Sequence, residues 1–206
     1  MRLGTLVRRG PIMLRAALRD LRYGGRPLGG TVRTRYSHLG AFHSTNTPYE
    51  DMARLFDEVT VEPDATIVDV GCGKGRSLNW LIGRFPGNAI VGIELDPDVC
   101  AATARRLRRR ANVTIVCGDA TTLLPPDATV FYLFNPFDAT VMGRFAAALL
   151  ERPAATVVYY NAKHLEPFRA EPRFAIRELD DPRLGHRSAI VTLRTAAEPR
   201  SPSGAA

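Results

Sequence analysis

From about residue 65 to residue 193, short apolar runs alternate with helical patterns, and this alternation limits the possible folds more than any other feature. Helices are expected at residues 76–85 and 97–109, and a further helix begins at Asp138. Strand-sized apolar runs separate and follow these helices, at residues 66–70, 89–94, 113–117, 129–134, 156–160, 174–179 and 189–193. Because strands that are apolar on both faces need helices over both, we expect an α/β domain with a mostly parallel sheet.

Size and composition exclude several classes of protein. The 206 residues suit one domain, and 45% hydrophobic with 24% charged residues excludes a coiled coil, a collagen-like repeat or a chain disordered throughout. No apolar run approaches the ~18 residues of a membrane span. The cysteines have no metal-site spacing, so we expect no metal and three unpaired, buried thiols: Cys72, Cys100 and Cys117. Their odd number and the lack of a signal-peptide pattern favour a cytoplasmic protein.

The first 35 residues differ from the rest of the chain in charge. They contain nine arginines and one acid, Asp20, so this segment accounts for the whole net charge of +7. Residues 11–23 fit an amphipathic helix that places three leucines on one side: Leu14, Leu18 and Leu21. Such a helix can bind an anionic membrane surface or nucleic acid, but an arginine-rich arm that only caps its own domain is the more ordinary alternative.

These patterns divide the chain into three parts. We expect a basic, helical N-terminal arm at residues 1–35 and the α/β domain at residues 36–195. Residues 196–206 are rich in alanine, proline and serine, which predicts a disordered tail. At the start of the domain, residues 47–50 (T-P-Y-E) fit a capping box that opens a helix ending near Val59.

Ligands of parallel sheets bind at the carboxyl ends of the strands, so the residues that follow each predicted strand are the candidate site. Three glycines at alternate positions follow the first strand and leave the backbone open to close approach by a ligand: Gly71, Gly73 and Gly75. Their spacing fits neither the G-x-G-x-x-G pattern of dinucleotide sites nor a P-loop. Lys74 and Arg76 beside them can pair with an anionic ligand or can be helix-surface charges.

Polar residues follow the next three strands. Glu94 can accept both hydroxyls of a ribose, and Asp119 can accept from an exocyclic amine. Asn135 and Phe137 place an amide beside a ring after the fourth strand. Each residue alone could be a turn or a helix cap, but their joint arrangement favours a nucleoside-binding crevice. The arginine run 105–110 is interpreted as the exposed end of a helix.

Together these segments resemble the successive motifs of class I S-adenosylmethionine-dependent methyltransferases. The resemblance extends over about residues 46–195 and rests on V-D-V-G-C-G-K-G (68–75), G-I-E (92–94), C-G-D-A (117–120) and F-N-P-F (134–137). The T-P-Y segment, G-C-G-K-G-R and F-N-P-F are also similar to those of small bacterial methyltransferases. The resemblance implies a Rossmann-like, doubly wound, mostly parallel seven-stranded sheet with an antiparallel last strand.

The resemblance further implies S-adenosylmethionine as cofactor and assigns three groups of residues to it. The turn after the first strand holds the methionine part: Asp69, Gly71, Cys72, Gly73 and Gly75. The residues after the second and third strands meet the ribose and the adenine: Glu94, Asp119 and Ala120. Two residues upstream of the first strand close over the cofactor: Thr47 and Tyr49.

Asn135-Pro136-Phe137 resembles the [DN]-P-P-[YF] motif of amino-group methyltransferases with one proline fewer. In that motif the amide holds the target N–H and the ring stacks on the substrate, so Asn135, near the sulfonium, and Phe137 are the implied catalytic residues. The acceptor stays open between nitrogen and oxygen. A neutral acceptor must lose a proton, and the candidate bases or orienting groups are His38, His43, Tyr160, Asn161 and His164.

Two other functions are compatible with parts of the sequence. A nucleotide- or NAD-binding α/β protein would use the same crevice, although the glycine spacing argues against it. A nucleic-acid- or membrane-associated module would act through the arginine-rich arm. The sequence therefore predicts a methyltransferase of unidentified acceptor, with these two alternatives.

Overall fold

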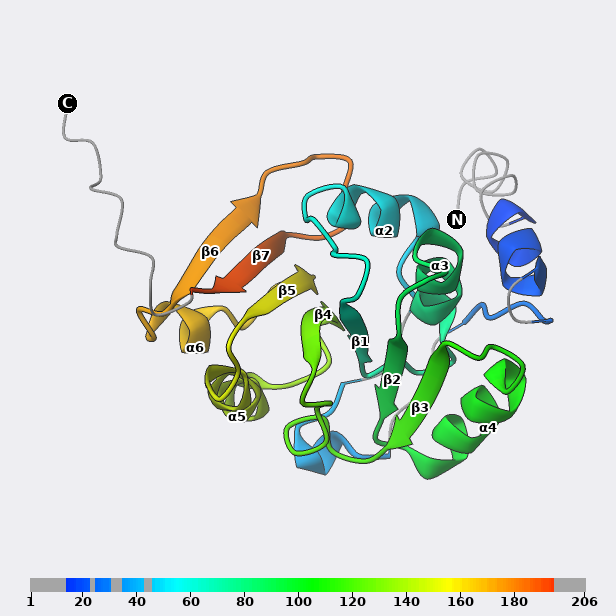
Figure 1. Cartoon of the computed structure of the whole chain (residues 1–206), viewed down its shortest axis with the longest axis horizontal. Helices are drawn as coiled ribbons and strands as arrows, with labels where there is room; N and C mark the ends of the chain where they lie inside the picture. The colour runs from blue at the N-terminus through cyan, green and yellow to red at the C-terminus, as the bar shows by residue number, and fades with distance from the viewer. Residues whose placement is uncertain (1–13, 23–24, 31–34, 43–45, 195–206) are drawn as a thin grey trace, which may run out of the picture.

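The computed structural model of the chain describes residues 14–22, 25–30, 35–42 and 46–194. In these ranges a seven-stranded sheet forms the centre of the molecule, with the strand order β3-β2-β1-β4-β5-β7-β6 (Figure 1). The strands are β1 (Thr66–Val70), β2 (Ile90–Glu94), β3 (Val113–Cys117), β4 (Ala128–Phe134), β5 (Ala155–Tyr160), β6 (Phe174–Leu179) and β7 (Ser188–Leu193). Each strand predicted from an apolar run is confirmed.

Strand directions agree with the predicted fold class. β1 pairs in parallel with β2 and β4, β2 with β3, and β4 with β5. The last strand, β7, lies between β5 and β6 and runs antiparallel to both. The order along the sheet reverses between β1 and β4, which is where a doubly wound sheet opens a crevice for a ligand.

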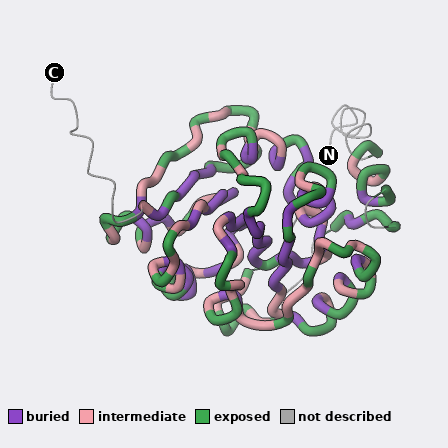
Figure 2. Tube along the Cα trace, viewed as in Figure 1, coloured by how far each residue is buried: buried purple, intermediate pink, exposed green. Residues whose placement is uncertain are grey.

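Helices cover both faces of the sheet (Figure 1). They are η1 (Ser37–Leu39), α2 (Tyr49–Phe56), α3 (Arg76–Arg84), α4 (Pro97–Leu107), α5 (Ala139–Leu150) and α6 (Glu166–Arg169). One core packs α2, α3 and the end of α4 against the sheet, and the other packs α5 and α6 against its opposite face. Figure 2 shows the central strands as buried, with exposed positions on the outer sides of the helices. Two faces covered by helices explain why the central strands β1, β4 and β5 are buried on both sides.

Two predicted helix starts are confirmed and one is wrong. Asp96 caps α4 by accepting from the amides of Asp98 and Val99, and Asp138 caps α5 by accepting from the amide of Val141. The capping box predicted for α2 does not form. Pro48 is the N-cap, without a side-chain cap, because the buried Thr47 hydroxyl bonds to the Tyr132 hydroxyl of β4 instead. The helix also ends at Phe56, earlier than expected.

The described part of the predicted arm helix, residues 14–22, is helical. It docks on the domain through Asp20, which is fully buried and accepts from the Leu28 amide (2.8 Å), the Tyr49 hydroxyl (2.7 Å) and the Arg76 guanidinium (2.6 Å). The arm is therefore attached beside α2 and α3. Residues 1–13 and the predicted tail 196–206 lie outside the described residues.

All three cysteines are unpaired, as expected, but only Cys72 and Cys100 are buried. Cys117 is exposed because it ends β3, which is the edge strand of the sheet. Over the described ranges, no helix combines the length and the apolar character that a membrane span requires. Within the same ranges, no group of three or more His, Cys, Asp or Glu side chains is arranged to hold a metal ion.

Candidate cofactor-binding site

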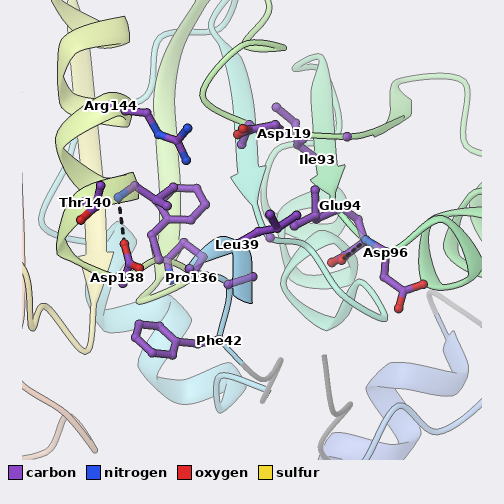
Figure 3. A pocket seen from close by; sticks show the side chains of 18 of the residues that line it. Leu39, Phe42, Ile93, Glu94, Asp96, Asp119, Pro136, Asp138, Thr140 and Arg144 are labelled. Carbon is purple, nitrogen blue, oxygen red and sulfur yellow. Dashed lines mark hydrogen bonds between the residues drawn. The ribbon is translucent and has the colours of Figure 1, made fainter. Parts of the chain in front are cut away.

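A cavity of about 560 Å³ lies at the carboxyl ends of β1 to β4, where the strand order reverses. In Figure 3, Asp119 and Arg144 lie on one rim, Glu94 and Asp96 lie on a second side, and Pro136, Asp138 and Thr140 face them. Each of the four strand ends contributes to the wall, through Gly71, Glu94, Asp119, Ala120, Pro136 and Phe137. The topology thus brings to one cavity the strand-end residues that the sequence singled out, except Gly73, Gly75 and Asn135.

The glycine-rich turn needs glycine at the cavity wall. Gly71 has φ of 75°, a left-handed conformation that side chains disfavour. A Cβ at this position would also lie 3.1 Å from the Cβ of Pro136, closer than ordinary packing allows. Gly73 and Gly75 share the left-handed conformation, so the alternate glycines form one sharply folded turn between β1 and α3.

Hydrogen bonds from α4 and β2 hold this turn in place. The Gly73 amide donates to Glu94 Oε2 (2.8 Å), and the Gly73 carbonyl accepts from the Thr103 hydroxyl (2.8 Å). The Arg106 guanidinium donates to the Lys74 carbonyl (2.8 Å). Sequence reasoning missed Thr103 and Arg106, because the arginine run 105–110 looked like an exposed helix end. Arg106 instead reaches back under the turn, and burial lowers its pKa.

Glu94 combines support of the turn with exposure to the cavity. Its Oε1 accepts from the Asp96 amide (2.9 Å), while Oε2 accepts from the Gly73 amide. Burial raises the pKa of Glu94, and the backbone amides that it accepts from oppose this shift. A carboxylate has about four acceptor positions, so two amides leave capacity for the hydroxyls of a ribose.

Asp119 divides its two oxygens between a turn and the cavity. Oδ1 accepts from the amide and the hydroxyl of Thr121, both at 2.8 Å. No hydrogen bond joins Oδ2 to another described residue, and the side chain lines the cavity. Asp119 therefore stabilises a turn through one oxygen and leaves the other oxygen open to the cavity, so its role in ligand binding stays a prediction. Ala120, buried next to it, presents only a methyl group to the cavity.

Four of the predicted cofactor residues are buried behind the cavity wall: Thr47, Tyr49, Asp69 and Cys72. Asp69 is 2% exposed and accepts from the Ser77 hydroxyl at the start of α3. Its burial raises the pKa of this carboxyl to about 7. The hydroxyls of Thr47 and Tyr49 bond to Tyr132 and Asp20, so the predicted closure of these residues over the cofactor stays a prediction.

The two residues implied in catalysis have different surroundings. Asn135 is 7% exposed, has φ of 39° and uses its Oδ1 to accept from the Tyr159 hydroxyl (2.8 Å). Its side chain is not part of the cavity wall. Phe137, by contrast, lines the cavity with a mostly buried ring. The motif assigns Asn135 and Phe137 to one substrate site, but only Phe137 lines the cavity in the tertiary structure.

The candidate bases are scattered. His38 lines the cavity, whereas His43 lies outside the described residues. The Tyr160 hydroxyl donates to the Asp51 carboxylate, and burial is the main cause that raises its pKa. The His164 ring stacks on Phe42, with 6.2 Å between ring centroids, and Asn161 has a left-handed backbone. None of these contacts selects a general base.

Lys74 and Arg76 do not face the cavity. Lys74 Nζ donates to the carbonyls of Gly29 (2.6 Å) and Gly30 (2.8 Å), and Arg76 pairs with Asp20. These two side chains therefore neither face a ligand in the cavity nor extend freely from the helix surface. They hold the N-terminal segment on the domain instead.

Two parts of the cavity wall carry no recognisable sequence signal. Residues 38–42 form one side, fixed by hydrogen bonds from the Phe42 amide to the Pro136 carbonyl (3.0 Å) and from the Asp138 amide to the Gly40 carbonyl (2.8 Å). Arg144 of α5 is exposed at the rim and has no hydrogen-bond or ion-pair partner among the described residues. A guanidinium there can stack on a planar ring or pair with an anionic group.

Comparison with known proteins agrees with this arrangement. A family model for a methyltransferase domain matches residues 67–157. Trans-aconitate 2-methyltransferase of Methylobacterium nodulans is 33% identical over 103 residues, which are 47% of this chain and 39% of that protein. Nocamycin O-methyltransferase of Saccharothrix syringae is 31% identical over 117 residues, 55% of this chain and 39% of that protein. The chain spans less than half the length of these curated relatives.

A solved structure extends the comparison to the fold. An RNA methyltransferase from Salinibacter ruber, in complex with S-adenosyl-L-homocysteine, superposes with a TM-score of 0.55 at 22% identity. The alignment covers 76% of this chain and 97% of that one, and it shows a shared fold. Residues 67–157 therefore match a methyltransferase domain, and the sheet order and the position of the cavity agree with the fold of S-adenosylmethionine-dependent methyltransferases.

Proposed function

We propose that this chain transfers a methyl group from S-adenosylmethionine to a carboxylate oxygen of its acceptor. The proposed cofactor is supported by one observation: the Gly71 turn, Glu94 and Asp119 all line the same cavity. Glu94 would accept from the ribose hydroxyls and Asp119 Oδ2 from the adenine amine, with Ala120 and Phe137 against the ring. The hydrogen-bond acceptors of this cavity fit a nucleoside that is neutral or positively charged.

When bound, the cofactor supplies an electrophilic methyl group on a sulfonium that is already a good leaving group. The chain itself then has to orient the acceptor at contact distance and exclude water. Residues 38–42, held against residues 136–138 by backbone hydrogen bonds, are placed to cover the cavity in this way.

The position of Asn135 favours oxygen over nitrogen as the acceptor atom. A target N–H would need the amide oxygen of Asn135, but the Asn135 side chain lies outside the cavity wall, where its oxygen accepts from Tyr159. Burial raises the pKa of Tyr159 to about 12, so its hydroxyl keeps its proton near neutral pH and remains a donor. The name of the Saccharothrix syringae relative records an oxygen acceptor.

A carboxylate acceptor also removes the need for a general base. Carboxyl groups ionise near pH 4, so they carry no proton at neutral pH that an enzyme would have to take. None of the scattered histidines and tyrosines therefore has to act as a general base. Trans-aconitate, the substrate named for the Methylobacterium nodulans relative, is itself a carboxylate.

Cofactor binding can be tested by thermal unfolding with S-adenosylmethionine, S-adenosylhomocysteine, NAD or ATP. A ligand at about 100 times its Kd stabilises the folded state by roughly 2.7 kcal/mol, and we expect this only with the two sulfur nucleosides. Glu94→Ala should weaken S-adenosylhomocysteine binding by about 2 kcal/mol, or about thirtyfold, as measured by calorimetry.

Glu94→Gln keeps the size but sets an NH2 group against the Gly73 or the Asp96 amide, so its free energy of unfolding, measured beside its affinity, separates support of the turn from the ribose contact. Glu62→Ala, at an exposed position away from the cavity, is the matched control. Stabilisation by NAD alone, or unchanged affinity in Glu94→Ala, would contradict the cofactor assignment.

The acceptor atom can be tested by labelling a fractionated lysate with radioactive S-adenosylmethionine. A methyl ester releases its label as volatile methanol in mild alkali, whereas N-methyl groups and methyl ethers do not. We expect base-labile label in a protease- and nuclease-resistant small-molecule fraction. Alkali-stable label would overturn the carboxylate proposal and leave the cofactor proposal intact.

We also propose that the protein works in the cytoplasm. The three unpaired cysteines, one of them exposed at the end of β3, support a reducing compartment.

A further inference from the structure

The N-terminal helix is attached to the domain by the side that carries Asp20. Asp20, fully buried, is held by the Arg76 guanidinium, the Tyr49 hydroxyl and the Leu28 amide. Ala16 and Ala17 lie on the same inward side and are partly buried. A helix of a globular protein ordinarily turns its apolar stripe toward the core. Here the ion pair of Asp20 fixes the opposite orientation.

The leucines of this helix consequently face solvent. Leu14, Leu18 and Leu21 are 62%, 56% and 46% exposed, and they form half of the exposed large hydrophobic side chains among the described residues. Positions i, i+4 and i+7 lie on one side of a helix, so the three leucines form a continuous outward strip. Figure 2 shows most of this helix, in its peripheral position, as exposed.

Arginines lie directly beside the leucine strip. Arg15, Arg19 and Arg22 are exposed and occupy the adjoining sector of the same helix. Arg19 lies 4.0 Å from the Glu50 carboxylate and over the Tyr49 ring, at the edge nearest the domain. The outward side of the helix thus has an apolar strip and a cationic strip in parallel.

We propose that this outward side of residues 14–22 docks on an anionic lipid surface. A membrane interface accepts apolar side chains at the acyl boundary and guanidinium groups at the lipid phosphates, side by side. Nucleic acid would use the arginines, but its backbone offers no apolar surface for three leucines. The nine arginines and single acid of the first 35 residues complement a negatively charged surface, and that acid is turned inward.

The test is co-sedimentation of the full chain with vesicles of phosphatidylcholine alone or with about 30% phosphatidylglycerol, at low and high salt. We expect binding to the anionic vesicles that weakens at high salt. The triple variant L14Q/L18Q/L21Q keeps good helix formers, and it should lose vesicle binding by about tenfold or more. R15Q/R19Q/R22Q should lose a similar factor.

The matched control is R105Q/R108Q/R109Q, which removes the same charge from the exposed end of α4 and should retain vesicle binding within about twofold. Unchanged stabilisation of each variant by S-adenosylhomocysteine shows that the domain is folded. No binding of the wild-type chain to anionic vesicles, or equal binding by the leucine variant, overturns the proposal. Tighter binding to a single-stranded RNA than to the vesicles, insensitive to the leucine changes, assigns the surface to nucleic acid instead.

Discussion

Two neighbouring parts of the carboxyl edge of the sheet use their polar side chains in opposite ways. At the ends of β2 and β3, Glu94 and Asp119 keep acceptor positions directed at the cavity. At the end of β4, Asn135 gives its amide oxygen to the Tyr159 hydroxyl of β5. The first region is available to a ligand, whereas the second is a brace between strands. A polar residue after a strand therefore indicates a site only when its partners are known.

The brace continues on the other face of the sheet. Asp51 of α2 is 5% exposed, and its Oδ2 accepts from the Tyr160 hydroxyl (2.5 Å) and the Gly185 amide (3.1 Å). These bonds hold α2, β5 and the connection between β6 and β7 together. Variants in the brace should change the stability of the protein, and variants in the cavity wall should change ligand affinity.

The largest effect is expected for Asp51→Ala. The change leaves the Tyr160 hydroxyl and the Gly185 amide without an acceptor. The free energy of unfolding, measured by urea denaturation, should therefore fall by about 3 kcal/mol. S-adenosylhomocysteine affinity should stay within about twofold, because Asp51 is not part of the cavity wall. Glu58→Ala, which breaks an exposed pair with Arg177, should cost less than about 1 kcal/mol. If Asp51→Ala lost S-adenosylhomocysteine affinity but kept its stability, Asp51 would belong to the ligand site and not to the brace.

A smaller effect is expected between Asn135 and Tyr159. Tyr159→Phe removes the buried hydrogen bond to Asn135 and a long one from the His164 amide (3.4 Å), and it should lower the free energy of unfolding by about 1 kcal/mol. Asn135→Ala should cost about 2 kcal/mol, since it also places alanine in a left-handed conformation. Asn135→Gly keeps that conformation accessible and should match Tyr159→Phe. If combining Asn135→Gly with Tyr159→Phe adds the two costs fully, the residues do not act as a brace.

The smallest effect concerns the pH dependence of stability. Burial raises the pKa of Asp69 from 3.8 to about 7 in the folded state. Between these values the folded state holds a proton that the unfolded state has lost, so stability falls as pH rises through 7. From about pH 6 to about pH 8, the wild type should lose about 1 kcal/mol relative to Asp69→Asn, which still offers an acceptor to Ser77.

Urea unfolding across this pH range measures the difference between the two proteins. Asp64→Asn, at an exposed position, is the control and should follow the wild type. Parallel profiles of the wild type and Asp69→Asn would refute the protonated, buried state of Asp69.

Much of the fold and of the cavity wall could be predicted because the signals are local. Apolar runs gave the strands, and Asp96 and Asp138 gave helix starts, since a cap bonds to amides only two or three residues away. The Gly71 turn, Glu94 and Asp119 could be placed because parallel strands end at the same edge of a sheet.

The partners of buried polar groups could not be predicted in the same way. Thr47 had the sequence of a cap, but packing placed it against Tyr132, which lies 85 residues further along the chain. Arg106 looked like a surface charge, yet the crossing of α4 under the glycine turn brought it to the Lys74 carbonyl. The hydrogen-bond partner of a buried polar group depends on which distant groups are buried beside it in the folded protein. A local sequence pattern does not contain this information.

The sequence by itself determined which elements form and which residues end each strand, because periodicity and capping act over a few residues. Only the tertiary structure decided that Asp20 turns inward and leaves Leu14, Leu18 and Leu21 exposed. The physical reason is that a buried ion pair and its hydrogen bonds must be satisfied together by groups from three separate segments. That requirement fixes the orientation of the helix against its own hydrophobic pattern.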